Sequence, residues 1–170
     1  MKKCRPSYFI LKLTLIILYT FGQSIAQTDD VVTIDYCDLV KDAEKHDKKI
    51  VRVNGQYIVG FEASILRNDK CENSSSWVEF DDSFERATNS EILKKFNQLT
   101  DTTPKKTKDG GIIYPAGIAE VTIIAEFFGI KPSQTIGGRK FTFGFGHLNG
   151  FDYKLKVLQI ENVQEPTKTK

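Results

Sequence analysis

The sequence predicts a mainly β fold with two short helices, arranged as a five-stranded Greek-key barrel of the OB type. The element order predicts it: a helix, three strands, a second helix and two more strands. A glycine in the middle of the long first strand predicts it too, since a bend there lets one strand serve both sides of a barrel. A different β-sandwich is the main alternative.

The first helix is expected to begin at Asp35. This residue can cap the helix, and Asp38 places a second negative charge in the first turn, where the helix dipole favours it. Tyr36, Leu39, Val40 and Ala43 follow at the spacing of one apolar helix face. The helix is therefore expected to bury this face against the barrel.

The first strand shows the clearest alternation in the chain. Its core face is expected to carry Val51, Val53, Tyr57, Val59 and Phe61. Its outer face is expected to carry Arg52, Asn54 and Gln56, and Gly55 marks a bulge or bend. A second strand runs to about Leu66, and a short third strand covers 77–80, with Trp77 expected in the core.

The second half of the chain supplies the remaining elements. Ser90 is expected to cap a helix that buries Ile92, Phe96 and Leu99. The fourth strand buries Ala119, Val121, Ile123, Ala125 and Phe127 and exposes Glu120, Thr122 and Glu126. The last strand runs from Tyr153 to about Val163, and its apolar phase slips after Val157, which indicates a bulge.

The N-terminus reads as an export signal. A basic start is followed by an apolar run from Leu13 to Phe21, which is shorter than the roughly 20 residues of a membrane span. Small residues in Ser24-Ile25-Ala26 predict cleavage after Ala26. We therefore expect a signal over 1–26, a single barrel domain over 27–164 and a solvated tail over 165–170. The mature chain is expected in the periplasm or secreted, without a stable membrane span.

The signal also changes the charge balance. It holds four of the 24 Lys and Arg residues and none of the 22 Asp and Glu residues. The mature chain therefore has two more acids than bases, which is not the basic footprint of a nucleic-acid-binding protein. The expected partner is a protein, a glycan or a small molecule of the cell envelope, and no cofactor is expected.

Cysteine usage points to one disulfide. Cys4 leaves with the signal, so Cys37 and Cys71 remain, and two cysteines in an oxidising compartment usually pair. The alternative is a pair of free buried thiols.

Three short motifs carry a family resemblance. They are Val51-Arg52-Val53-x-Gly55, then Gly60-Phe61-Glu62, and later Gly144-Phe145-Gly146-His147-Leu148. The chain resembles a group of exported bacterial proteins of unknown function in which a helix cysteine, a V-R-V-x-G strand, a second cysteine and a G-x-G-H-L turn follow in this order. The resemblance implies the barrel, the export and the Cys37–Cys71 pair, and it implies no activity.

His147, Glu62 and Arg52 are the candidate binding residues. His147 lies between glycines, and it is expected either to bond backbone groups across the barrel mouth or to act as a metal ligand or general base. Glu62 is expected on the outer face or paired with Arg52 or His147, and Asp152 is the other possible helper. His46 is expected in solvent.

Two functions stay open from the sequence. One is a non-catalytic binding or structural module. The other is a small extracytoplasmic hydrolase or metal-dependent enzyme centred on His147. Phe141, Phe143 and Phe145 alternate at strand spacing, which fits a ligand platform or a hairpin packed over the core.

Overall fold

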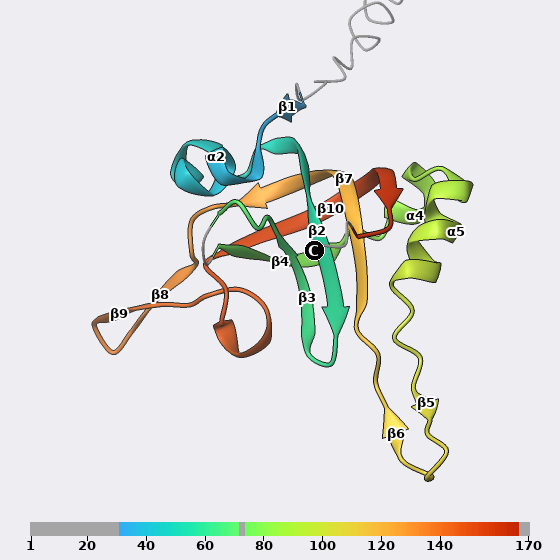
Figure 1. Cartoon of the computed structure of the whole chain (residues 1–170). Coiled ribbons are helices and arrows are strands. Elements are labelled where there is room, and N and C mark those ends of the chain that lie inside the picture. Colours follow the sequence, from blue (N-terminus) through green and yellow to red (C-terminus); the bar gives the residue numbers. More distant parts are fainter. Residues whose placement is uncertain (1–30, 72–73, 167–170) are drawn as a thin grey trace, which may run out of the picture.

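The computed structural model describes residues 31–71 and 74–166 (Figure 1). The predicted signal, its cleavage site and residues 167–170 of the predicted tail lie outside the described residues. Within the described part, no helix has both the length and the apolar character that crossing a bilayer requires.

Five strands close into a barrel. β2 (Ile50–Gly60) pairs with β3 (Ala63–Arg67), and β3 pairs with β4 (Ser75–Phe80). β4 runs parallel to β10 (Tyr153–Gln164), β10 pairs with β7 (Gly117–Phe128), and β7 returns to β2. This closed circle of five strands, with helical chain between its third and fourth strands, is the predicted OB-like Greek-key barrel, and the prediction is confirmed.

Gly55 marks the point at which β2 begins to serve two neighbours. β2 pairs with β7 from Ile50 onward, but with β3 only from Gln56 onward. A Cβ atom at Gly55 would lie 2.8 Å from the Arg67 carbonyl oxygen, so only glycine fits where β3 joins. β2 thus serves two neighbours, as the sequence predicts, but its register with β7 runs through Gly55 without a bulge.

The strand phases place the core as expected. The interior holds Val51, Val53, Val121 and Ile123, each at most 5% exposed, whereas Arg52, Asn54 and Glu120 lie outside. The register of β10 against β7 shifts after Val157, which confirms the expected bulge. Trp77 is a correction: Ser76 and Val78 point inward, so the side chain between them lies on the outer face.

Helices close the barrel ends. α5 (Ser90–Leu99) buries Phe96, whose ring centroid lies 5.4 Å from that of Tyr57. Its N-cap is Asn89 and not Ser90, because the Asn89 side-chain oxygen accepts from the backbone N–H groups of Glu91 and Ile92. Three short elements lie outside the barrel. Two are helices, α3 (Ala43–His46) and α4 (Phe84–Ala87), and the third is strand β1 (Val32–Thr33), which pairs parallel to β2.

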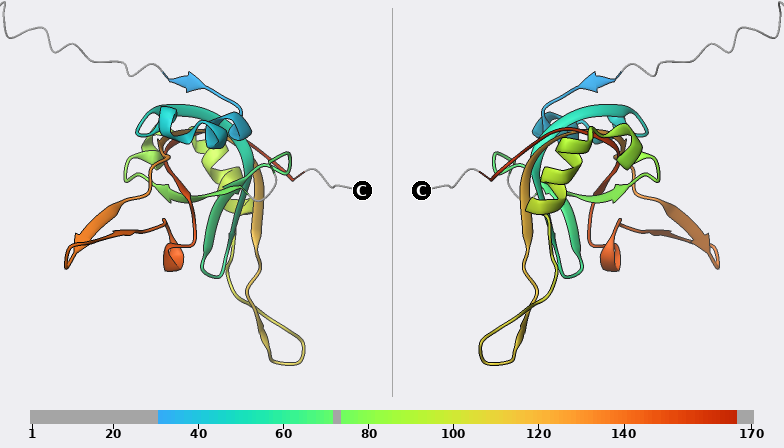
Figure 2. Two further views of the ribbon diagram at one scale, coloured as in Figure 1. Left: turned by 90° about the vertical axis from the view of Figure 1, so that its left-hand side faces the viewer. Right: turned by 90° about the vertical axis from the view of Figure 1, so that its right-hand side faces the viewer.

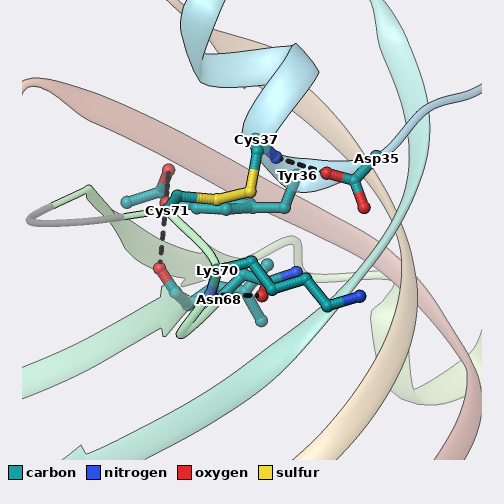
Figure 3. The surroundings of a disulfide bond; sticks show 8 residues. Asp35, Tyr36, Cys37, Asn68, Lys70 and Cys71 are labelled. Carbon is teal, nitrogen blue, oxygen red and sulfur yellow. Dashed lines mark hydrogen bonds between the residues drawn. A yellow bond between two sulfur atoms is a disulfide. The ribbon is translucent and has the colours of Figure 1, made fainter.

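The N-terminal helix α2 (Tyr36–Lys41) is fixed by a cap, a disulfide and a buried phenol (Figure 3). Asp35 caps it by accepting from Cys37 N–H at 2.8 Å. Cys37 and Cys71 form the expected disulfide, with their Cα atoms 5.4 Å apart. The Tyr36 hydroxyl donates to the Leu66 carbonyl at 3.1 Å and meets Ser76 Oγ at 3.0 Å, and burial raises the pKa of Tyr36 to about 12.

Two hairpin arms extend away from the barrel (Figure 2). Arm A joins β5 (Lys105–Lys106) to β6 (Ile112–Ile113). Arm B joins β8 (Ser133–Ile136) to β9 (Arg139–Thr142). A 3-10 turn, η1 (His147–Asn149), follows arm B and leads into β10.

Adjacent residues of β7 test the strand phase. Val121→Asp places an unpaired carboxylate in the core and is expected to cost more than about 4 kcal/mol, or to prevent folding. Thr122→Asp introduces the same side chain on the outer face and is expected to cost about 1 kcal/mol or less. Urea unfolding measures both, and equal costs would contradict the assigned phase.

The disulfide is testable in the mature protein. Thiol labelling under denaturing, non-reducing conditions is expected to detect no free cysteine. Replacing both Cys37 and Cys71 by alanine releases a loop of about 35 residues in the unfolded chain, which costs about 4 kcal/mol in the chain-entropy model. Two reactive thiols in the oxidised mature protein would refute the bond.

Candidate functional site

An apolar row crosses the outer face of the barrel. Ile58 on β2 lies opposite Ile118 on β7 and opposite Ile65 on β3, and Ile65 lies opposite Trp77 on β4. All four side chains are partly exposed and lie outside the core. Direct cross-strand partners contact one another, so the row is continuous over four strands.

A polar row runs beside it on the same face, two residues further along each strand. Gln56 Nε2 donates to Glu120 Oε1 at 3.1 Å, and the Arg67 guanidinium donates to Gln56 Oε1 at 3.0 and 3.2 Å. These polar side chains are already bonded to one another. On this face, the apolar row is therefore the surface that a ligand could contact without breaking these hydrogen bonds.

Two loops meet at the end of the apolar row. His147 Nε2 in η1 lies 3.3 Å from Glu62 Oε2 in the β2–β3 turn, and both side chains are about half exposed. The neighbouring apolar side chains are much more exposed, Phe61 at 78% and Leu148 at 85%. The Phe61 ring also lies 6.2 Å from that of Tyr114, at the base of arm A.

The same two loops contain most of the strained backbone. Four non-glycine residues in the described chain have positive φ, and three of them are Glu62 (60°), Leu148 (52°) and Asn149 (56°). Such residues cost about 1–3 kcal/mol each and gather at functional sites. Their concentration here supports this end of the barrel as the candidate site.

An outer aromatic cluster holds the η1 loop against the barrel; it consists of Trp77, Phe128, Phe145 and Phe151. The rings of Trp77 and Phe151 lie 5.4 Å apart, and those of Phe128 and Phe145 lie 6.4 Å apart. Gly146 has φ 68° and lies directly on the Trp77 indole, where a Cβ atom would overlap the ring. The loop position is therefore set by this packing, which leaves Leu148 exposed to solvent and His147 half exposed beside Glu62.

The structure brings two of the three candidate residues together. Glu62 pairs with His147, and the imidazole meets this side chain rather than backbone groups. Arg52 lies elsewhere: its guanidinium donates twice to the Glu161 carboxylate, at 2.7 and 2.9 Å, which lowers the pKa of Glu161. Asp152 is not a helper of His147, because it pairs with Lys131.

Other expectations for this region need correction. Phe61 is not on the core face, because β2 ends at Gly60 and Phe61 begins the turn. His46 is buried in α3 rather than solvated, at 7% exposure. The three alternating phenylalanines share no strand face: Phe141 in β9 is exposed, Phe143 follows the strand, and Phe145 belongs to the outer aromatic cluster.

Sequence reasoning did not find the apolar row. Its signal was present, because Ile58 and Ile118 are isoleucines at outward-facing positions of alternating strands. Within residues 31–71 and 74–166, no three His, Cys, Asp or Glu side chains gather as a metal site would require. His147 and Glu62 therefore stand as a pair.

Comparison of the chain with protein-family models, curated proteins and solved structures finds no match in any of the three.

The loop packing predicts different effects for neighbouring substitutions. Gly146→Ala places a methyl group against the indole at a positive φ and is expected to cost about 1–3 kcal/mol and to shift the emission of Trp77, the single tryptophan. His147→Ala removes the exposed contact with the Glu62 carboxylate and is expected to cost less than about 1 kcal/mol without shifting the emission. Urea unfolding followed by fluorescence measures both, and a shifted emission for His147→Ala would contradict this packing.

Proposed function

We propose that this protein is an exported, non-catalytic binding module that uses the outer barrel face at the β2–β3 turn and η1. One observation carries the proposal. The partly exposed apolar row of Ile118, Ile58, Ile65 and Trp77 lies beside Phe61 and Leu148, which are 78% and 85% exposed.

The packing of the barrel interior favours a binding site on the outer surface. The barrel interior is filled by side chains, including the fully buried Phe127, Leu66, Leu155 and Ile160, as expected for a small barrel. Tyr36 of α2 and Phe96 of α5 are buried against this interior as well. A binding surface for a macromolecule or an extended ligand therefore has to lie on the exterior.

The location also fits how OB barrels are used. Their ligands contact the second and third strands and the loops that follow the first and fourth strands. Here those elements are β3, β4, the β2–β3 turn and the β7–β10 loop that contains η1. This support is an analogy of fold, and contiguous exposed apolar side chains supply the independent physical argument, since they mark interaction sites.

Export is part of the proposal. Disulfides persist in oxidising compartments, and the Cys37–Cys71 bond fits the periplasm or the exterior. The N-terminal signal predicted from the sequence points the same way. The partner is accordingly a component of the cell envelope, a protein, a glycan or a small molecule, and not a nucleic acid.

The second candidate function is a small hydrolase or metal-dependent enzyme centred on His147. One observation favours it, the 3.3 Å contact between the imidazole and the Glu62 carboxylate. A histidine oriented by a carboxylate can act as a general base. The pair still needs a nucleophile or a third ligand, and Arg52 and Asp152, the other polar candidates, are held in separate ion pairs.

Site-specific photo-crosslinking in producing cells tests the binding surface. The photoreactive residue p-benzoylphenylalanine replaces Phe61 or Leu148, and a matched variant carries it at Val32, an exposed apolar position in β1. We expect positions 61 and 148 to give the same discrete adduct and position 32 to give none. Adducts that are absent at 61 and 148, or equal at all three positions, would sink the binding function.

A further inference from the structure

The candidate site lies between the two hairpin arms. In all three views the β2–β3 turn and η1 lie between arm A and arm B, and both arms reach further from the barrel than the two loops do (Figures 1 and 2). We call the surface formed by the two arms, with Phe61 and Leu148 at its floor, the cradle. An occupant of the binding surface has to fit between the arms.

Both arms are basic, whereas the mature chain expected after removal of residues 1–26 has two more acids than bases. Arm A carries three lysines against Asp109 alone, and residues 130–150 contain no acidic residue. In the part of the chain that the structure describes, none of the five arm cations forms an ion pair; they are Lys105, Lys106, Lys108, Arg139 and Lys140.

Apolar side chains are interleaved with these cations. In arm A, Lys105 pairs with Ile113 and Lys106 pairs with Ile112, both isoleucines being more than half exposed. In arm B, Arg139 lies opposite Ile136, which is 53% exposed. A two-stranded hairpin is only marginally stable alone, so such side chains gain most from a partner that covers them.

We propose that the cradle binds an acidic segment of a protein partner, whose apolar side chains contact Phe61 and Leu148 and whose carboxylates face the two arms. This inference rests on the proposed function and adds the chemistry of the occupant. Complementary charge on the two arms would set the orientation of the segment, and burial of the apolar floor would supply the affinity.

The shape and chemistry of the cradle disfavour two other anionic occupants. A bilayer is flat, and it would meet the polar arm tips, Lys108-Asp109-Gly110 and Gly137-Gly138, before it reached Phe61 and Leu148. Single-stranded nucleic acid is bound by stacking bases on aromatic rings. The cradle exposes the aromatic Phe61, Tyr114 and Phe141, but more of its exposed apolar side chains are aliphatic: Leu148, Ile112, Ile113 and Ile136.

A random dodecapeptide library displayed on phage is the probe. It is selected on the oxidised mature protein, and the recovered peptides are measured against three variants. The arm variant carries glutamate at all five arm cations, and the floor variant carries Phe61→Ser and Leu148→Ser. The matched control carries Lys94→Glu and Lys95→Glu, which reverse two exposed lysines on α5 outside the cradle. Circular dichroism first verifies that each variant folds.

We expect recovered peptides enriched in Asp or Glu together with Leu, Ile or Phe. Their affinity is expected to fall about tenfold or more in the arm variant and in high salt, and to change little in the control. Peptides that need the floor but tolerate arm reversal would overturn the acidic partner and leave the binding function standing. Peptides indifferent to the floor variant would overturn both. Arm-dependent binding of oligo(dT), or of phosphatidylglycerol vesicles, with no acidic peptides recovered, would replace the protein partner by that ligand.

Discussion

The structure depends on one strand being hydrogen-bonded on both sides. From Gln56 onward β2 pairs with β7 and β3 at once, and this double pairing closes the barrel. It also creates the candidate site. Ile58 points outward from β2 at a position where β2 is paired with both β7 and β3. Ile118 and Ile65 then fall on either side of it, and the apolar row follows from closure itself. Without Gly55, the close approach of β3 would be blocked, and neither the closed barrel nor the row would form.

Much of the fold could be predicted because its signals are local. Alternation of period two assigned the buried faces of β2 and β7, and the phase slip after Val157 located a real bulge. The cap at Asp35 was visible for the same reason, since one side chain and the next two residues determine it. Asn89 shows the limit of this reasoning. Asn89 and Ser90 are both good capping residues, and the choice between them depends on where the preceding chain leaves the barrel.

The candidate site was less predictable because it is made by pairing between distant segments. Glu62 and His147 are brought together only when the β2–β3 turn and the β7–β10 loop meet at one end of the barrel. Trp77 was misplaced because a short strand offers too few residues to fix its phase, and the glycine that packs on its ring is about 70 residues away. Phe61 continues the core-face alternation in the sequence, yet the strand stops one residue earlier. Whether a strand ends before or after such a residue is decided by the partner strand, not by the residue itself.

The two ends of the molecule differ in a way that connects stability with function. At the α2 end, a disulfide, a helix cap and the buried Tyr36 hydroxyl hold the chain in place. At the other end, three non-glycine residues adopt positive φ, and apolar side chains stay in solvent. Glu62 and Leu148 cost about 1–3 kcal/mol each, and Asn149 costs less because asparagine tolerates this conformation. The total is comparable with the roughly 4 kcal/mol that the disulfide contributes in the chain-entropy model. Stabilisation at one end of the barrel thus offsets strain at the other. Strained loops beside an exposed apolar surface fit a binding site that is already preorganised before its partner binds.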